Sequence, residues 1–141
     1  MLKKMVIFFI LVFFLAPSVF AQAAKTVTYT ALPKAGEKYY IGNEFYFTYQ
    51  FDQKPKMGTS ILKIEVFTKD GKKDTSLRIK GNTGMPSMRG AHDSEPVAFQ
   101  LNKAGIYLMP VNIVMPGAWE VKLDFYNADK NIFSGSVRFS V

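Results

Sequence analysis

Two methionines and the only histidine of the chain lie in one short stretch, Thr83–Glu95, with the sequence TGMPSMRGAHDSE. Met85, Met88 and His92 are spaced by three and four residues, but the glycines and the proline around them disfavour a helix. We therefore expect a loop that can curl and bring two thioethers and an imidazole together. Thioether sulfur is a soft ligand suited to Cu(I), and imidazole also binds copper. The stretch predicts a copper site formed by Met85, Met88 and His92.

A purely structural interpretation of the same residues is available. Methionine is a flexible residue that fills gaps between packed elements, so Met85 and Met88 are also consistent with a loop pinned onto the end of the domain. His92 would then make only a loop hydrogen bond. Met109 and Met115 fall in a region expected to pack or turn nearby and could supply a further sulfur. The chain has no cysteine, which excludes thiolate ligands, disulfides and a cysteine nucleophile.

Enzymatic chemistry finds little support in the sequence. His92, Asp93 and Ser94 are adjacent, whereas the members of a catalytic triad converge from separate places. No serine is framed by glycines as in a nucleophile elbow. The carboxylates show no pairing of the kind that a glycosidase uses. We expect a protein that is not an enzyme and has no catalytic residues.

The N-terminus has the layout of a secretory signal peptide. Lys3 and Lys4 precede the unbroken apolar run Met5–Leu15, and small residues follow up to Ala21. The run is shorter than the roughly 20 apolar residues of a spanning helix, so residues 1–21 are predicted to be a cleaved leader. Retention of the leader as a membrane anchor is the alternative. Either way we expect an exported protein, periplasmic or secreted, whose mature part is residues 22–141.

The basic charge of the chain limits its partners. Lysine and arginine number 18 against 11 acidic residues, for a net charge of +7. Nucleic-acid binding would need basic residues between exposed aromatics, but the aromatic stripe of residues 45–51 has none, so we expect no nucleic acid and assign the stripe to the core. Tyr39, Tyr40 and Tyr46 could form an exposed aromatic patch for a protein or peptide partner.

The first half of the mature chain is predicted to form strands. Residues 44–52 alternate strictly between apolar and polar side chains, the period of a strand buried on one face. Residues 62–66 and 77–80 do the same, and the Asp70-Gly71 dipeptide between them is a tight-turn signal. We therefore expect these two segments to pair as a hairpin. Residues 25–30 and 37–41 are expected to be two further short strands.

The second half continues the pattern with expected strands at 97–101, 106–114, 119–125 and 136–141. Residues 106–114 are almost wholly apolar, which predicts a strand covered on both faces, and Pro110 within it predicts a bulge or an edge position. About eight short strands, with turn signals between them and no helical period beyond the leader, predict two packed antiparallel sheets. The expected fold is an immunoglobulin-like β-sandwich forming a single domain.

The C-terminal half of the chain resembles the FixH-like and YtkA-like families of exported bacterial domains. The resemblance rests on the Gly-Met-Pro-x-Met loop at residues 84–88, the Gly-x-Tyr turn at 105–107 and Met-Pro-Gly-x-Trp-Glu-Val at 115–121. It implies a small β-sandwich in the bacterial envelope. FixH-like members are associated with the assembly of copper-containing respiratory oxidases, so the resemblance implies copper and an envelope metalloprotein or oxidase assembly component as partner. The leader departs from the FixH pattern, in which a membrane anchor is retained.

Two hypotheses follow from these observations. The first is an exported, non-enzymatic sandwich that binds or delivers copper through Met85, Met88 and His92. The second is a structural or adaptor domain that contacts another envelope protein and binds no metal. Membrane association is expected only if the leader stays uncleaved.

Overall fold

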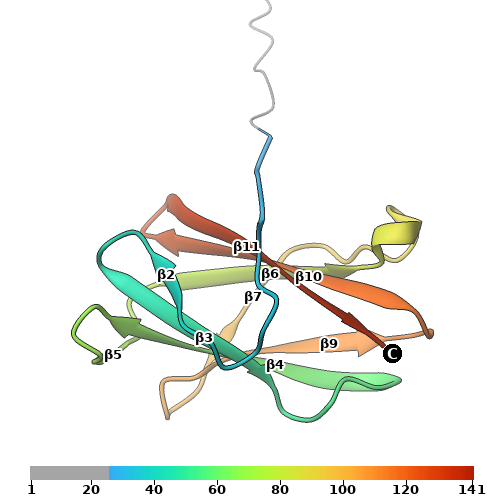
Figure 1. Ribbon diagram of the computed structural model, residues 1–141, viewed down its shortest axis with the longest axis horizontal. Helices are drawn as coiled ribbons and strands as arrows, with labels where there is room; N and C mark the ends of the chain where they lie inside the picture. The colour runs from blue at the N-terminus through green and yellow to red at the C-terminus, as the bar shows by residue number, and fades with distance from the viewer. Residues whose placement is uncertain (1–25) are drawn as a thin grey trace, which may run out of the picture.

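The computed structural model describes residues 26–141, which form a two-layer β-sandwich (Figure 1). The predicted leader, residues 1–21, lies outside this part of the chain. Eleven strands are present among the described residues instead of about eight, because short edge strands add to the long ones. The predicted all-β sandwich is confirmed. No helix in residues 26–141 is both long and apolar enough to cross a membrane.

The first sheet contains five strands, which run in the spatial order β1 (Thr30–Ala31), β11 (Lys130–Ser140), β10 (Ala118–Asn127), β6 (Arg78–Gly84) and β7 (Val97–Ala98). The second contains β2 (Tyr39–Ile41), β3 (Phe45–Phe51), β4 (Gly58–Thr68), β9 (Tyr107–Ile113) and β8 (Gln100–Leu101), with β5 (Lys73–Asp74) paired to β4. All pairs are antiparallel except β1 with β11, which is parallel. The only helical segment in the described chain is one 3₁₀ turn, η1 (Pro86–Met88).

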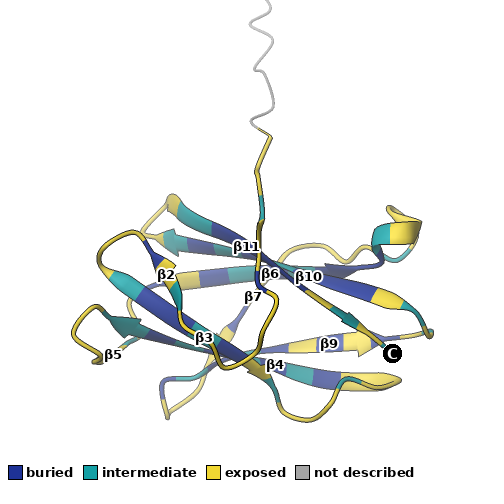
Figure 2. Cartoon of the chain, viewed as in Figure 1, coloured by how far each residue is buried: buried dark blue, intermediate teal, exposed yellow. Residues whose placement is uncertain are grey.

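The core lies between the two sheets and follows from the alternation of the long strands (Figure 2). In β10 every second residue from Trp119 to Phe125 is buried, as the sequence predicts. In β3 the side chains of Phe47 and Tyr49 are buried, and Phe45 and Phe51 pack against the same cluster. Phe47 meets Phe125 across the sandwich with ring centroids 4.5 Å apart. The aromatic stripe is therefore core.

The predicted hairpin of residues 62–66 and 77–80 is wrong. The Asp70-Gly71 turn forms, but the returning strand is only β5, which pairs with Val66 and Phe67. The chain then crosses to the other sheet, where β6 pairs with β10 and β7. Alternation of apolar and polar residues specifies which face of a strand is buried, but it does not specify the strand with which it pairs. The apolar face of β6 is therefore buried equally well in the opposite sheet.

Two further expectations about strands fail for related reasons. Residues 97–101 form two short strands in different sheets, with Phe99 buried at the crossing, so Val97 and Leu101 are about half exposed. Strand β9 is covered on one face only, and Pro110 and Asn112 point outward. Pro110 is nevertheless in the predicted edge position, because β8 pairs only with Tyr107 and Leu108. The expected strand 25–30 is reduced to β1, which begins at Thr30.

The predicted aromatic patch is smaller than expected. Tyr40 is 66% exposed, but Tyr46 is only 9% exposed. Its ring stacks on Phe67 at 5.1 Å between centroids, and the ammonium of Lys38 lies 4.7 Å from its centroid. Tyr46 is covered by its neighbours on the outer face of the second sheet, so it adds little accessible surface.

Candidate functional site

The loop that carries the predicted ligands joins β6 to β7 and is closed at its base. The Thr83 amide donates to the Ser94 hydroxyl at 2.9 Å, and the Ser94 amide donates to the Thr83 carbonyl at 2.8 Å. This reciprocal pair fixes the two ends of the loop against each other. The conformation of the residues between them is therefore anchored to the first sheet.

Asp93 holds the inside of the loop. Its carboxylate accepts the Gly90 amide at 2.9 Å and lies 3.8 Å from the Arg89 guanidinium. The same carboxylate lies against Gly84, where a Cβ atom would come within 2.0 Å of it. Only glycine leaves room for Asp93 in this position, so the glycine of the Gly-Met-Pro-x-Met sequence has a local packing role.

The outer tip of the loop is a single tight turn. Arg89 has φ −54° and ψ 136°, Gly90 has φ +82°, and the Ala91 amide donates to the Met88 carbonyl at 3.2 Å. These angles define a type II turn, which requires a positive φ at its third residue and so favours glycine there. The turn folds the chain back between Met88 and Ala91, and His92 follows it directly.

The three predicted ligands occupy different environments. Met85 is buried at 3% exposure in the core cluster, and its methyl group lies against Gly117. Met88 is 39% exposed. His92 is half-buried, with its ring centroid 6.5 Å from that of Trp119. Met88 begins the type II turn and His92 directly follows it, while Met85 faces the core.

The surroundings of the three residues differ as well. His92 borders a cleft of about 440 Å³ whose other lining residues are Thr83, Asp93, Ser94, Val97, Met109, Pro110, Asn112, Val114 and Trp119. Neither Met85 nor Met88 lines this cleft. Met109 borders it from the core, and Met115 packs against the core cluster. Among the described residues no group of three or more histidine and carboxylate side chains is arranged to hold a metal, so a metal site here would depend on thioether sulfur.

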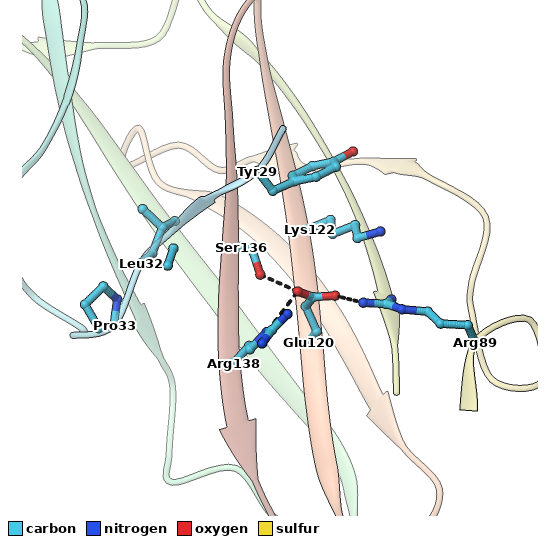
Figure 3. Close-up of a pocket in the computed structure, with 9 residues that line it drawn as sticks. Tyr29, Leu32, Pro33, Arg89, Glu120, Lys122, Ser136 and Arg138 are labelled. Carbon is cyan, nitrogen blue, oxygen red and sulfur yellow. Dashed lines mark hydrogen bonds and ion pairs between the residues drawn. The ribbon is translucent and has the colours of Figure 1, made fainter. Parts of the chain in front are cut away.

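A second arrangement, which the sequence analysis missed, lies beside the loop on the outer face of the first sheet (Figure 3). Glu120 of β10 is only 3% exposed although it points away from the core. Its Oε1 accepts the Ser136 hydroxyl at 2.6 Å and the Arg138 Nε at 3.1 Å. Its Oε2 accepts an Nη2 hydrogen of Arg89, in the loop. Glu120 thus ties the loop to β10 and β11.

This network fixes the charge state of Glu120. Burial by itself would raise the pKa of the carboxyl, but hydrogen bonds from Ser136, Arg89 and Arg138 outweigh burial and lower the pKa to about 2. The hydrogen bond to Glu120 in turn raises the pKa of Arg89. Glu120 is therefore an ionised anchor whose two oxygens are both occupied, and it is a poor candidate for acid–base work.

One contact of this network, between Glu120 and Arg138, could have been predicted from the sequence. Glu120 and Arg138 both fall on outward positions of predicted strands, and they stand directly opposite each other in the β10–β11 pair. A pairing of the last two strands would have placed them together. Arg89 carries no such signal, because its position depends on the type II turn of the loop.

The chain is a two-sheet β-sandwich with a clamped Met-Pro-x-Met loop at one end. Comparison with known proteins identifies the family of such domains to which it belongs. The sequence model of the YtkA-like family matches residues 42–124, which is more than half of the chain. The chain belongs to the YtkA-like family. The matched region spans β3 to most of β10 and includes the whole loop.

Among solved structures, the crystal structure of FetP from the uropathogenic E. coli strain F11, recombinantly expressed in the periplasm of E. coli BL21(DE3), is similar. The TM-score is 0.52 at 15% sequence identity, with 76% of this chain and 93% of that chain covered. At this identity the likeness extends to the fold alone. No curated protein matches the sequence, and the FixH-like resemblance remains a prediction.

Proposed function

We propose that this YtkA-like domain is an exported protein that binds copper at the tip of the clamped loop. The observation that carries the proposal is the type II turn, which begins at Met88 and is followed directly by His92, on a loop fixed by Thr83, Ser94 and Asp93. A thioether and an imidazole on such a pre-positioned loop form a ligand pair suited to Cu(I). Little ordering of the loop is then needed when the metal binds.

Met85 is not a copper ligand in the conformation described. Its side chain is part of the core, so it becomes a third ligand only if the loop loosens and the thioether turns outward. Two ligands from Met88 and His92 leave coordination positions that a partner protein can fill. That arrangement suits transfer of copper better than storage, and the partner class that we propose is an envelope metalloprotein or an oxidase assembly component.

The proposal places the protein outside the cytoplasm and assigns it no enzymatic activity. The leader sequence supports export to the periplasm, and the mass of the N-terminus of the purified protein tests cleavage after Ala21. Among the described residues, Glu120 is the carboxyl whose pKa is clearly shifted, and both of its oxygens accept hydrogen bonds within the protein. It is therefore poorly suited to acid–base catalysis, which favours a binding role for the domain.

A titration with Cu(I) against a competing chelator tests copper binding directly. We expect Met88→Ala and His92→Ala each to weaken Cu(I) binding at least about tenfold, equivalent to about 1.4 kcal/mol. Met57→Ala is the matched control, because Met57 is 49% exposed in the loop between β3 and β4 of the other sheet. The Cu(I) affinity of this variant should equal that of the unmodified protein. Absence of Cu(I) binding, or equal affinity in all variants, would overturn the proposal.

The alternative function is an adaptor domain that binds a protein partner and no metal. Burial of Met85 favours it, because this methionine then acts as the anchor that pins the loop to the core. The same titration separates the two functions. An adaptor would show no Cu(I) affinity. Met85→Ala would then lower only the free energy of unfolding of the domain.

A further inference from the structure

The outer face of the first sheet carries a cleft of about 480 Å³ around the Glu120 network (Figure 3). Its walls come from the segment before and after β1, from β10 and β11, and from the loop. The lining residues are Tyr29, Ala31, Leu32, Pro33, Arg89, Glu120, Lys122, Ser136 and Arg138. This cleft is distinct from the one beside His92, since the two share no lining residue.

The charge of the cleft is unbalanced in favour of cations. Arg89, Lys122 and Arg138 line it, and Glu120 is the single carboxylate among the lining residues. Glu120 is 3% exposed, and its carboxylate lies between the two guanidinium groups that bind it (Figure 3). Asp93, which lies 3.8 Å from Arg89, adds a second negative charge beside the cleft. The three cations therefore exceed the carboxylates Glu120 and Asp93 by one charge.

The cations keep hydrogen-bond donors for a ligand. Arg138 uses its Nε atom on Glu120, and its terminal nitrogens have no partner among residues 26–141. Its side chain is 70% exposed. Arg89 is 41% exposed and reaches Glu120 through Nη2. The Lys122 ammonium lies 5.0 Å from the ring centroid of Tyr29, over the cleft.

Glu120 also fixes the direction of these donors. It holds Arg138 from one side and Arg89 from the other (Figure 3). Guanidinium groups that are already oriented lose less conformational freedom when they bind an anion. The carboxylate is thus a positioning residue, and the binding donors are the outer edges of the two guanidinium groups.

We propose that this cleft binds a phosphate monoester or inorganic phosphate at the terminal nitrogens of Arg138, with Lys122 and Arg89 as further cations. A phosphate monoester carries about −1.5 to −2 charges at neutral pH and has three acceptor oxygens, one for each of the three cations. A carboxylate has only two oxygens and one charge. Guanidinium groups bind phosphate oxygens through paired N–H donors. The site shares no ligand residue with the proposed copper site, although Arg89 belongs to the same turn as Met88. Its ligand is either free phosphate or the headgroup of an anionic lipid.

Calorimetric titration of the purified protein with inorganic phosphate, at constant ionic strength, tests the proposal. We expect measurable binding, and we expect Arg138→Gln to weaken it at least about tenfold, the effect of losing one charge-assisted contact. Arg78→Gln is the matched control, because Arg78 is 52% exposed at the far end of the same sheet, and it should bind phosphate as the unmodified protein does. Acetate should bind clearly more weakly than phosphate.

Vesicles distinguish the two sources of the phosphate group. Binding to vesicles containing phosphatidic acid, and not to pure phosphatidylcholine, with displacement by inorganic phosphate, would assign the lipid headgroup. Binding of inorganic phosphate without vesicle binding would assign the free anion. The proposal is overturned if phosphate does not bind, if acetate binds equally well, or if Lys122→Gln and Arg138→Gln, confirmed as folded by their thermal transitions, both retain full affinity.

Discussion

The side chains at the tip of the loop differ in whether they have partners within the protein. Arg89 is bound to Glu120 and lies close to Asp93, and Glu120 has partners on both oxygens. Met88 and His92, on either side of Arg89 in the chain, make no side-chain hydrogen bond with any residue from 26 to 141. Groups whose partners are all within the protein contribute to stability, whereas groups without partners are available to a ligand. The contact between Arg89 and Glu120 should therefore govern folding, and Met88 and His92 should govern copper binding.

The largest effect on stability is expected from Glu120→Gln. The substitution removes the charge that three hydrogen bonds stabilise, and a pKa lowered from 4.5 to about 2 corresponds to about 3 kcal/mol of folding free energy. Chemical denaturation measures this loss. Glu65→Gln is the control, because the Glu65–Lys73 pair is more exposed and should be worth less than about 1 kcal/mol. Equal effects for the two variants would contradict the role of Glu120.

The same carboxyl predicts a specific dependence of stability on pH. Because the folded-state pKa of Glu120 is depressed, its contribution is complete above the unfolded value of 4.5 and is lost as the pH falls towards about 2. We expect the stability gap between the unmodified protein and Glu120→Gln to shrink by about 3 kcal/mol over this range. Denaturation curves at several acidic pH values measure the gap. A gap independent of pH would show that Glu120 acts through packing alone.

An intermediate effect is expected from Gly84→Ala. The added methyl group would lie 2.0 Å from the Asp93 carboxylate, so the loop must shift, at a cost of about 2 kcal/mol. In the Asp93→Ala background the obstruction is removed, and the same substitution should cost less than about 1 kcal/mol. A double-mutant cycle by denaturation measures the coupling. Additive effects would mean that Asp93 does not clamp the loop.

The smallest effects on stability are expected from the two proposed copper ligands. Met88→Ala and His92→Ala should change the free energy of unfolding by less than about 0.5 kcal/mol, since their side chains are partly exposed and make no hydrogen bonds with the described residues. Thermal or chemical denaturation in the absence of metal measures this. A large loss in either variant would assign the residue to the structure of the loop and weaken the contrast with the Arg89–Glu120 contact.

Sequence patterns predicted the fold well where alternation was long and uninterrupted. The buried residues of β3 and β10 follow directly from period-two spacing, because each long strand must turn one face to the other sheet. The pairing partners did not follow. The strand predicted at residues 77–80 is observed from Arg78 onward as part of β6, in the sheet opposite to the expected one. Residues 97–101 divide between both sheets. Short edge strands carry too few residues for a pattern.

The site was predictable to a lesser degree. Glycine and proline around Met85 and Met88 correctly indicated a loop, but the spacing could not show that Met85 turns into the core against Gly117. The Glu120 network joins residues that are 31 and 18 positions apart along the chain. Such contacts depend on strand register and on the type II turn, which local patterns do not specify.

X-ray absorption at the copper edge of the protein loaded with Cu(I) identifies the atoms that bind the metal. We expect both sulfur and nitrogen scatterers in the first coordination shell, with the sulfur contribution reduced in Met88→Ala and the imidazole contribution lost in His92→Ala. A shell of nitrogen and oxygen alone, or a spectrum unchanged in both variants, would contradict the proposed copper site.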